Sequence, residues 1–394
     1  MFLGELYGPI GFGAMVAVGV VLAIATQPTV GMISDYTRSR WGRRKPYIAI
    51  GTLLDVVFLI GIALADNFLI LVALVILLNF SSNFAQGPFQ GYIPDLVPAR
   101  QVGLASGLMG LMIILGNITG VGLVAASVAL GEQTGVHLNH PYGLAIVGIG
   151  IIEAVTALAT LIAVDEGGRQ APPREGKSWL EIARSAWGRD FLAERSYLWM
   201  LATRLFLIAA PAMTLVTAPF LMRRTFGFAD ADATFWVFVT GAVMVVVSAT
   251  MVVPAALVSN RIGRKPVIFA TASAGALGAA VVALAPTLPV AIAGAALLGV
   301  GAGSFLAVDW ALMSDIIPKK TTGRYMGLAN VTEAVAATPA PALLAGAMIT
   351  LSSLILADDA APEGPRIAVA VSLILFVSGL LALTRVDPTR READ

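Results

Sequence analysis

Long apolar runs alternate with short polar segments along the whole chain. Each run holds about 20 residues or more, the length a helix needs to cross roughly 30 Å of hydrocarbon. None of them shows the period-two alternation of a barrel strand. The pattern therefore predicts about eleven membrane-spanning helices, near residues 9–32, 47–65, 67–93, 102–130, 142–164, 196–222, 233–258, 266–285, 288–313, 325–356 and 365–384.

The composition supports an all-α integral membrane protein. The chain is 58% hydrophobic and 12% charged, whereas a typical water-soluble domain has about 25% charged residues. Its net charge of +1 gives no reason to propose a nucleic-acid partner. There is no cysteine, and the two histidines, His137 and His140, share one polar segment. We therefore expect no metal site.

Positive charge is concentrated in every second loop. Lysine and arginine accumulate in the cytoplasmic loops of membrane proteins. We therefore expect a multi-pass protein of the plasma membrane with a cytoplasmic C-terminus. Arg223 and Arg224 are an exception, although side chains at a helix end can reach the headgroups. The basic loops are 35–45, 165–195, 261–265 and 319–324, together with the tail after Thr384.

The sequence contains an internal repeat. The segment PDLVPARQVGLASGLM (94–109) matches SDIIPKKTTGRYMGLA (314–329), with matched residues 220 positions apart, as Asp95 and Asp315 are. The basic loops RKP at 44–46 and 264–266 obey the same offset. A shared offset in two separate loops indicates duplication. We expect an N-terminal bundle over 1–164, a cytoplasmic linker over 165–195 and a C-terminal bundle over 196–394.

The two halves differ in their number of spans. The first has five and the second six, because the span at 196–222 has no counterpart at an offset of 220. We expect an additional helix before Met1, lost through a mis-assigned start or a truncation. Restoring it gives twelve spans and places both termini in the cytoplasm.

The loop after the first span resembles a motif of the major facilitator superfamily. It reads GMISDYTRSRWGRRKP, from Gly31 to Pro46. The long gap between Asp35 and Gly42 resembles sucrose–proton symporters and glycoside–cation symporters, as do GPFQGYIPDLVP and VDWALMSDIIP. The resemblance implies two pseudo-symmetric six-helix bundles. It also implies a secondary active transporter, with proton-coupled sugar or glycoside symport by alternating access.

Two alternative functions stay open at this point. The chain can be a proton-driven antiporter that exports drugs or metabolites, or a transport-inactive receptor on the same fold. We do not expect an enzyme, since no nucleophile–base pair or metal-ligand constellation occurs. We expect no cofactor. Melibiose-type relatives select cations with aspartates, but the matching stretch here has Gln27 and no acid, which favours the proton as coupling ion.

The resemblance also points to a cytoplasmic gate. Asp35 ends one helix, and the nearby cations can pair with it and with helix C-terminal carbonyls. The second copy has Asn260 where the motif has aspartate, so we expect the gate to be single. For Arg38 and Arg40 we favour a role in topology alone. The expected gate residues are Gly31, Asp35, Gly42, Arg43, Arg44, Lys45, Asp95, Asp315, Arg264 and Lys265.

Five charged residues fall inside the predicted spans. Such charges cost at least about 2.5–3.5 kcal/mol each and are functional candidates. Arg204, Asp309 and Glu333 lie at similar depth in the second half, which predicts a buried cluster for proton coupling, with an ion pair as the alternative for Asp309. For Asp55 and Glu153 we favour structural pairing.

Amide side chains recur at helical spacing in one predicted span. Asn83, Gln86 and Gln90 share a face, and amides both donate and accept hydrogen bonds, as sugar hydroxyls require. Interhelical hydrogen bonding is the alternative. We add Asn117, Asn330 and Trp310 as candidate substrate-binding residues, Trp310 for stacking on a sugar or for ordinary packing. The expected partners are a small molecule, in particular a sugar, and the lipid bilayer, with the protein a monomer.

Overall fold

A computed structural model describes most of the chain. It covers residues 2–98, 100–135, 142–166, 171, 173–174, 176–318, 321–337, 339–356 and 362–389. The described residues are 86% helical and contain no strand. Eleven helical stretches among them are long and apolar enough to cross a membrane. The expected class, an all-α integral membrane protein, is confirmed.

The first half provides five of these stretches. Pro46 lies in the first turn of α2, where its missing N–H costs nothing. The side chain of Asn67 accepts a hydrogen bond from the N–H of Leu69 and so caps α3. The helices are α1 (Phe2–Asp35), α2 (Lys45–Leu64), α3 (Phe68–Gln90), α4 (Tyr92–Leu96), α5 (Val102–Thr134) and α6 (Gly143–Ala163).

The linker and the second half follow. The linker contains α7 (Trp179–Ser185) and the short 3₁₀ helix η1 (Arg189–Ala193). The helices of the second half are α8 (Arg195–Phe220), continued by the π-helical turn η2 (Leu221–Thr225), then α9 (Asp230–Ile262), α10 (Arg264–Leu284), α11 (Leu288–Ile316), α12 (Thr322–Ala337), α13 (Pro339–Leu356) and α14 (Glu363–Thr384).

Some predicted spans differ in detail from the observed helices. The prediction at 67–93 is α3 followed by the short α4. The span predicted at 325–356 contains α12 and α13. The helix predicted at 233–258 extends to Ile262, because its charged ends lie outside the apolar run.

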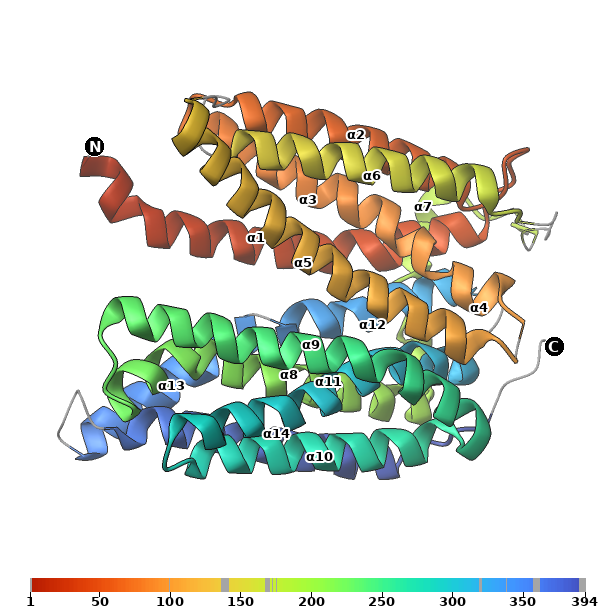
Figure 1. Cartoon of the computed structure of the whole chain (residues 1–394). Helices are drawn as coiled ribbons and strands as arrows, with labels where there is room; N and C mark the ends of the chain where they lie inside the picture. The colour runs from red at the N-terminus through yellow and green to blue at the C-terminus, as the bar shows by residue number, and fades with distance from the viewer. Residues whose placement is uncertain are drawn as a thin grey trace.

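The helices before and after the linker form two groups that lie side by side (Figure 1). Within them, α2 packs on α3 and α6, and α11 packs on α9 and α10. The two groups meet where α1 contacts α12 and where α5 contacts α9 and α11. This arrangement repeats the internal symmetry of the sequence: Gly107 in α5 faces α9, while Gly327 in α12 faces α1.

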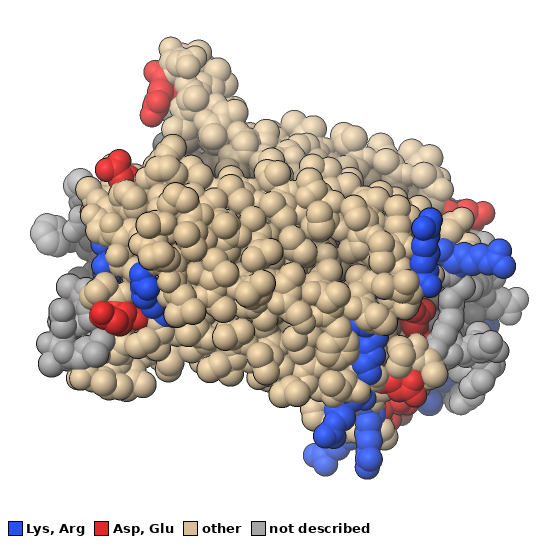
Figure 2. All heavy atoms as spheres, turned by 60° about the horizontal axis from the view of Figure 1, so that its bottom comes forward, with Lys and Arg blue, Asp and Glu red and all other residues tan. Residues whose placement is uncertain are grey.

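The charged side chains on the face in Figure 2 lie at the two ends of the molecule. The face in Figure 2 shows a wide uncharged belt between them, and lysine and arginine are more numerous at the end where the C-terminus lies. The helices run from one end to the other through this belt. A belt of this kind is what a membrane-spanning bundle exposes to lipid.

Glycines allow close helix contacts in the second half. A Cβ atom on Gly278 of α10 would lie 2.6 Å from the carbonyl oxygen of Gly294 and 2.7 Å from the amide nitrogen of Leu298, both in α11. Transmembrane helices that approach this closely require small residues at the contact.

We expect Gly278→Ala to destabilise the protein. The added methyl group forces α10 and α11 apart, at a cost of about 1–3 kcal/mol. In detergent, the melting temperature should fall by at least about 2 °C. Gly241→Ala in α9 is the matched control, since an added Cβ there meets nothing within 4 Å. An equal effect of both substitutions would contradict the proposed contact.

Candidate functional site

Arg204 in α8 lies between two carboxylates in the second half. Its Nη1 forms an ion pair with Asp309 of α11, and its Nη2 lies 2.8 Å from Oε2 of Glu333 in α12. The side chains of Arg204 and Asp309 are 0% and 2% exposed, and that of Glu333 is 33% exposed. The structure thus brings together the three charged residues that the sequence placed at similar depth.

A cavity of about 140 Å³ adjoins this cluster. All three charged residues line it, together with the apolar side chains of Leu207, Ile208, Pro211, Ala302, Phe305 and Leu306. Inside the cluster, Oδ1 of Asp309 and Nε of Arg204 have no hydrogen-bond partner in the described part of the protein. The cavity is therefore a small apolar space with one charged wall.

Trp310 packs against the guanidinium group of Arg204. The guanidinium carbon of Arg204 lies 4.9 Å from the centre of the Trp310 ring, a favourable cation–π distance. Trp310 is buried and does not line the cavity. Its indole therefore positions Arg204, and sugar stacking on it stays a prediction.

Amide side chains of α1 and α3 form a second polar group. Nε2 of Gln27 donates to Oδ1 of Asn83 and, at 2.9 Å, to Oε1 of Gln86. Gln90 and Asn330 are buried, and their amide oxygens have no partner among the described residues. The sequence did not include Gln27 in this group, because a lone amide in an apolar run has no periodic signal.

Backbone contacts connect the amide group to the second half. A Cβ atom on Gly327 of α12 would lie 2.7 Å from the backbone of Gln27. Asn330 is three residues further along α12, and Glu333 another three. One helix therefore contacts the amide group and carries a carboxylate of the charged cluster. Asn117 is exposed in α5 and makes no hydrogen bond to either group.

Asp55 and Glu153 pair with each other and not with a residue of either group. Asp55 of α2 accepts a hydrogen bond from Ser81 of α3 and shares a carboxyl–carboxyl hydrogen bond with Glu153 of α6. Such a bond requires a proton on one carboxyl group. The structure places these two acids in helix packing of the first half.

Arg44 is the centre of a buried ionic network at the basic end of the molecule. Its guanidinium lies 2.9 Å from Asp35 and 2.5 Å from Asp95. It also donates to the hydroxyl of Thr322 in the second half. Arg43 forms a further ion pair with Asp95. Burial lowers the pKa of Arg44, but Asp95 and Asp35 outweigh it, and the pKa is raised overall.

Asp35 attaches this network to the other half. Its carboxylate accepts hydrogen bonds from the backbone N–H groups of Gly323, at 3.0 Å, and Arg324, at 3.4 Å. Both lie in the first turn of α12, where the helix dipole favours an anion. A carboxylate of one half thus caps a helix of the other.

Two of the expected glycines have steric roles here. A Cβ atom on Gly31 would lie 2.7 Å from the carbonyl carbon of Gly323, so the halves touch backbone to backbone. Gly42 has φ of +108°, which L side chains rarely adopt, and a Cβ there would lie 2.7 Å from Oε1 of Glu166.

The second-half copy of the network is weaker. Arg264 lies 3.4 Å from Asp315 and donates to the Asn260 side chain beside Gly103 in α5. Asn260 occupies the place of Asp35 but is uncharged. Lys265 donates instead to backbone carbonyls at and after the end of α14, those of Thr384 and Val386. It is not part of the ionic contact.

Glu166 also contacts the loop that contains Arg43 and Arg44, although the sequence did not indicate it. It follows α6, and its carboxylate accepts the backbone N–H groups of Arg43, Arg44 and Lys45 at 2.6, 3.1 and 2.8 Å. It also accepts the hydroxyl of Tyr92. One acid after a span gives no sequence signal for such a contact. The Lys45 side chain forms no ion pair with a described carboxylate.

The linker bridges the two halves. Arg324 of α12 donates to both carboxylate oxygens of Asp190, at 2.6 and 2.8 Å, and to the backbone carbonyl of Ala186. Ala186 and Ile182 in turn pack against Met32 of α1. The hydrogen bonds from Arg324 hold the pKa of Asp190 below its usual range.

The described residues contain no group of three or more His, Asp or Glu side chains that could hold a metal ion. Both histidines of the sequence lie outside those residues. The two helix groups, the cavity with one charged wall and the hydrogen bonds between the halves are typical of a multi-pass membrane transporter, not of an enzyme. The chain belongs to the Major Facilitator Superfamily, whose family model matches residues 2–341.

Similar proteins bear out the predicted resemblance to sugar transporters. The chain is 30% identical to human proton-associated sugar transporter A over 194 residues, 44% of this chain and 24% of that protein. It is 32% identical to the rice (japonica) sucrose transport protein SUT1 over 124 residues, 26% of this chain and 23% of that protein. The matched region thus spans about a quarter of each relative's length.

Solved structures share the fold. The E. coli fucose:proton symporter FucP superposes with a TM-score of 0.65 at 12% identity, over 96% of this chain and 93% of that one. The proton:xylose symporter XylE gives 0.67 at 17% identity, over 96% and 87%. At these identities the likeness concerns the fold alone.

We expect Asp95→Asn to loosen the basic end of the protein more than Asp315→Asn. Asp95 accepts two guanidinium groups and a hydroxyl, and removing one partner of a buried ion pair costs about 3–5 kcal/mol. The chain has no cysteine, so a single cysteine introduced as Ala311→Cys can be labelled selectively. Ala311 is buried, and labelling there therefore measures opening. Its maleimide labelling should rise about tenfold with Asp95→Asn and less than about threefold with Asp315→Asn. The reverse order would refute the asymmetry.

The Asp190–Arg324 contact predicts a defined pH dependence. Because the pKa of Asp190 is lowered in the folded protein, its contribution is present above the unfolded-state pKa and is lost as pH falls through the folded value. Asp190→Asn should lower the melting temperature equally from about pH 8 to pH 5, and the difference should shrink below about pH 4. Asp232→Asn, at an exposed site in α9, is the control. A difference that grows on acidification would contradict this assignment.

Proposed function

We propose that the protein carries a sugar together with protons by alternating access of its two helix groups. The observation that carries this proposal is Arg204 shared between Asp309 and Glu333 beside the cavity. The similarity to transporters named for sucrose and for proton-associated sugar transport supports it.

The charge balance of the cluster favours proton binding. One guanidinium and two carboxylates carry a net charge of −1. A net charge within the bilayer is costly, so one added proton brings the cluster to neutrality. A proton that binds while the cluster is open to one side of the membrane and leaves when it is open to the other provides the coupling.

Glu333 is the group best placed to exchange this proton. The Asp309 side chain is 2% exposed and that of Glu333 is 33% exposed. Asp309 therefore serves as the lasting counter-ion of Arg204. When Glu333 is protonated, it releases Arg204 from one of its two ion pairs.

The amide group provides the neutral wall of the proposed sugar site. Gln86 is exposed, while Gln90 and Asn330 have buried amide oxygens with no partner among the described residues. A sugar hydroxyl can donate to such oxygens and accept from amide N–H groups. Since α12 contacts the amide group and carries Glu333, it provides a direct path from sugar contact to protonation.

The ionic network around Arg44 serves as the gate of this cycle. With its contacts intact the halves are closed at the basic end. We place this end, and the C-terminus with it, in the cytoplasm of a cell whose plasma membrane holds the protein. In this proposal residues 1–164 and 196–394 move as two bundles of a monomer, joined by the linker at 165–195.

Two alternatives predict different fluxes. A proton-driven exporter moves its substrate against the proton flow. Entry of the substrate into vesicles therefore releases protons and acidifies the medium outside. A transport-inactive receptor binds sugar without flux. Sugar-induced alkalinisation outside vesicles supports symport and excludes both.

We expect Glu333→Gln to abolish proton-driven accumulation but to retain exchange of labelled for unlabelled sugar. Glutamine mimics the protonated acid, so steps that need no proton release continue. Radiolabelled disaccharides, beginning with sucrose, and a pH gradient across proteoliposomes measure both fluxes. Accumulation should fall about tenfold or more, within the usual range of coupling free energies. We expect the same loss for Asp309→Asn.

Glu153→Gln is the matched control, because Glu153 lies within a predicted span but outside the cluster. It should accumulate sugar as the unmodified protein does. Undiminished accumulation by both Glu333→Gln and Asp309→Asn would remove the cluster from the mechanism.

A further inference from the structure

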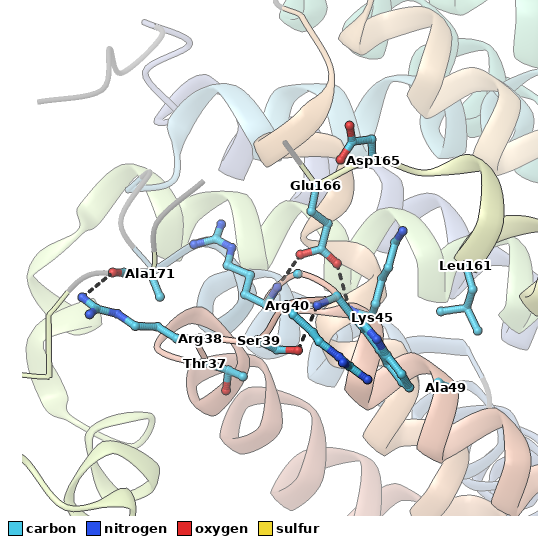
Figure 3. Close-up of a pocket in the computed structure, with 13 residues that line it drawn as sticks. Thr37, Arg38, Ser39, Arg40, Lys45, Ala49, Leu161, Asp165, Glu166 and Ala171 are labelled. Atoms are coloured by element: carbon cyan, nitrogen blue, oxygen red, sulfur yellow. Dashed lines mark hydrogen bonds between the residues drawn. The ribbon is translucent and has the colours of Figure 1, made fainter. Parts of the chain in front are cut away.

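A second and larger cavity lies at the basic end of the first half. Its volume is about 830 Å³, and it is bounded by the loop between α1 and α2 and by residues that follow α6 (Figure 3). It is separate from the Arg204 cavity and shares no lining residue with it. The lining residues include Arg38, Arg40, Arg43, Lys45, Asp165 and Glu166.

Three of the four cations in this cavity have no carboxylate partner among the described residues. Arg43 is paired with Asp95 in the gate. Arg38 donates only to the backbone carbonyl of Ala171, at 3.3 Å. Neither Arg40 nor Lys45 forms an ion pair with a described acid. The loop therefore contains more positive charge than the gate uses.

The acids of the cavity do not neutralise this charge. Glu166 points into the loop between Arg40 and Lys45, and both its oxygens accept backbone N–H groups (Figure 3). In the same view the Asp165 carboxylate lies further from the loop than that of Glu166. The Glu166 carboxylate already occupies the N-terminus of α2, so an additional anion would bind to the arginine and lysine side chains.

The cavity opens beside surfaces suited to lipid. Its apolar wall is formed by Ala49 and Leu161. The exposed Trp41 is at its rim, with the Arg40 guanidinium 5.8 Å from the ring centre. Tryptophan is typical of the membrane–water interface. Further along the same helices, Leu53 of α2 and Ile162 of α6 are 66% and 75% exposed.

We propose that this cavity binds the phosphate headgroup of an anionic phospholipid from the leaflet at the basic end. Arg38 and Arg40 bind the phosphate oxygens, since guanidinium groups match phosphate geometry, and Lys45 adds a third cation. The acyl chains lie along the exposed apolar faces of α2 and α6. A free phosphate uses the same cations but gains nothing from Trp41 and these faces.

The test compares two matched pairs of substitutions in the full chain. Arg38→Gln/Arg40→Gln removes two cations of the cavity, and Arg223→Gln/Arg224→Gln removes two arginines in η2 of the second half. Native mass spectrometry of the detergent-solubilised protein measures binding of dioctanoyl phosphatidylglycerol and dioctanoyl phosphatidylcholine. Inorganic phosphate and glycerol 3-phosphate are added separately as soluble competitors.

We expect the unmodified protein to bind phosphatidylglycerol at least about tenfold more tightly than phosphatidylcholine. Arg38→Gln/Arg40→Gln should remove this preference, since each cation near an anionic surface contributes measurably to binding. Arg223→Gln/Arg224→Gln should retain it. Ala49→Glu adds an acid to the cavity and leaves the loop arginines in place. It should also remove the preference, and it replaces Arg38→Gln/Arg40→Gln in the test if that double variant fails to fold.

Three results would each overturn the proposal. One is equal binding of the two lipids by the unmodified protein. Another is a preference that survives both Arg38→Gln/Arg40→Gln and Ala49→Glu. The third is displacement of the lipid by inorganic phosphate or glycerol 3-phosphate at concentrations equal to that of the lipid, which would assign the cavity to a soluble phosphate compound instead.

Discussion

The cost of a charge inside the bilayer is the constraint on which this structure depends. Arg204 has a fully buried guanidinium, and only the two acids beside it make that position tolerable. Because the acids outnumber the cation, the cluster has a reason to take up a proton. The same constraint explains why Asp55 and Glu153 share a carboxyl–carboxyl hydrogen bond where no cation is available.

At the basic end the charges are also paired within one half, but they form hydrogen bonds to the other half as well. Arg44 is buried with Asp35 and Asp95, and Asp35 reaches across to the start of α12. Separating the halves would leave these ion pairs intact and break the hydrogen bonds to Thr322, Gly323 and Arg324, which water can replace. A contact of this kind can open and close reversibly, whereas an apolar contact of equal area would favour closure alone.

The pseudo-symmetry is built into the backbone but not into the charges. Gly103 and Gly323 occupy equivalent positions, each facing the opposite half. Asp35 is matched by the neutral Asn260, so the contact made by Asp35 is stronger than the equivalent contact made by Asn260. The charged network around Arg44 therefore has no equal in the second half, and the linker contact of Asp190 with Arg324 lies next to it on α12.

The sequence alone determined the class of protein, the number of spans and the repeat, because hydrophobic length and a fixed offset are properties of the chain itself. It also indicated the Arg204 cluster, since charges in apolar runs are rare and their depth can be counted. Only the tertiary structure decided that Gln27 joins the amide group and that Glu166 caps α2. Those contacts join segments more than 50 residues apart, and a single amide or acid has no periodicity that would reveal its partner.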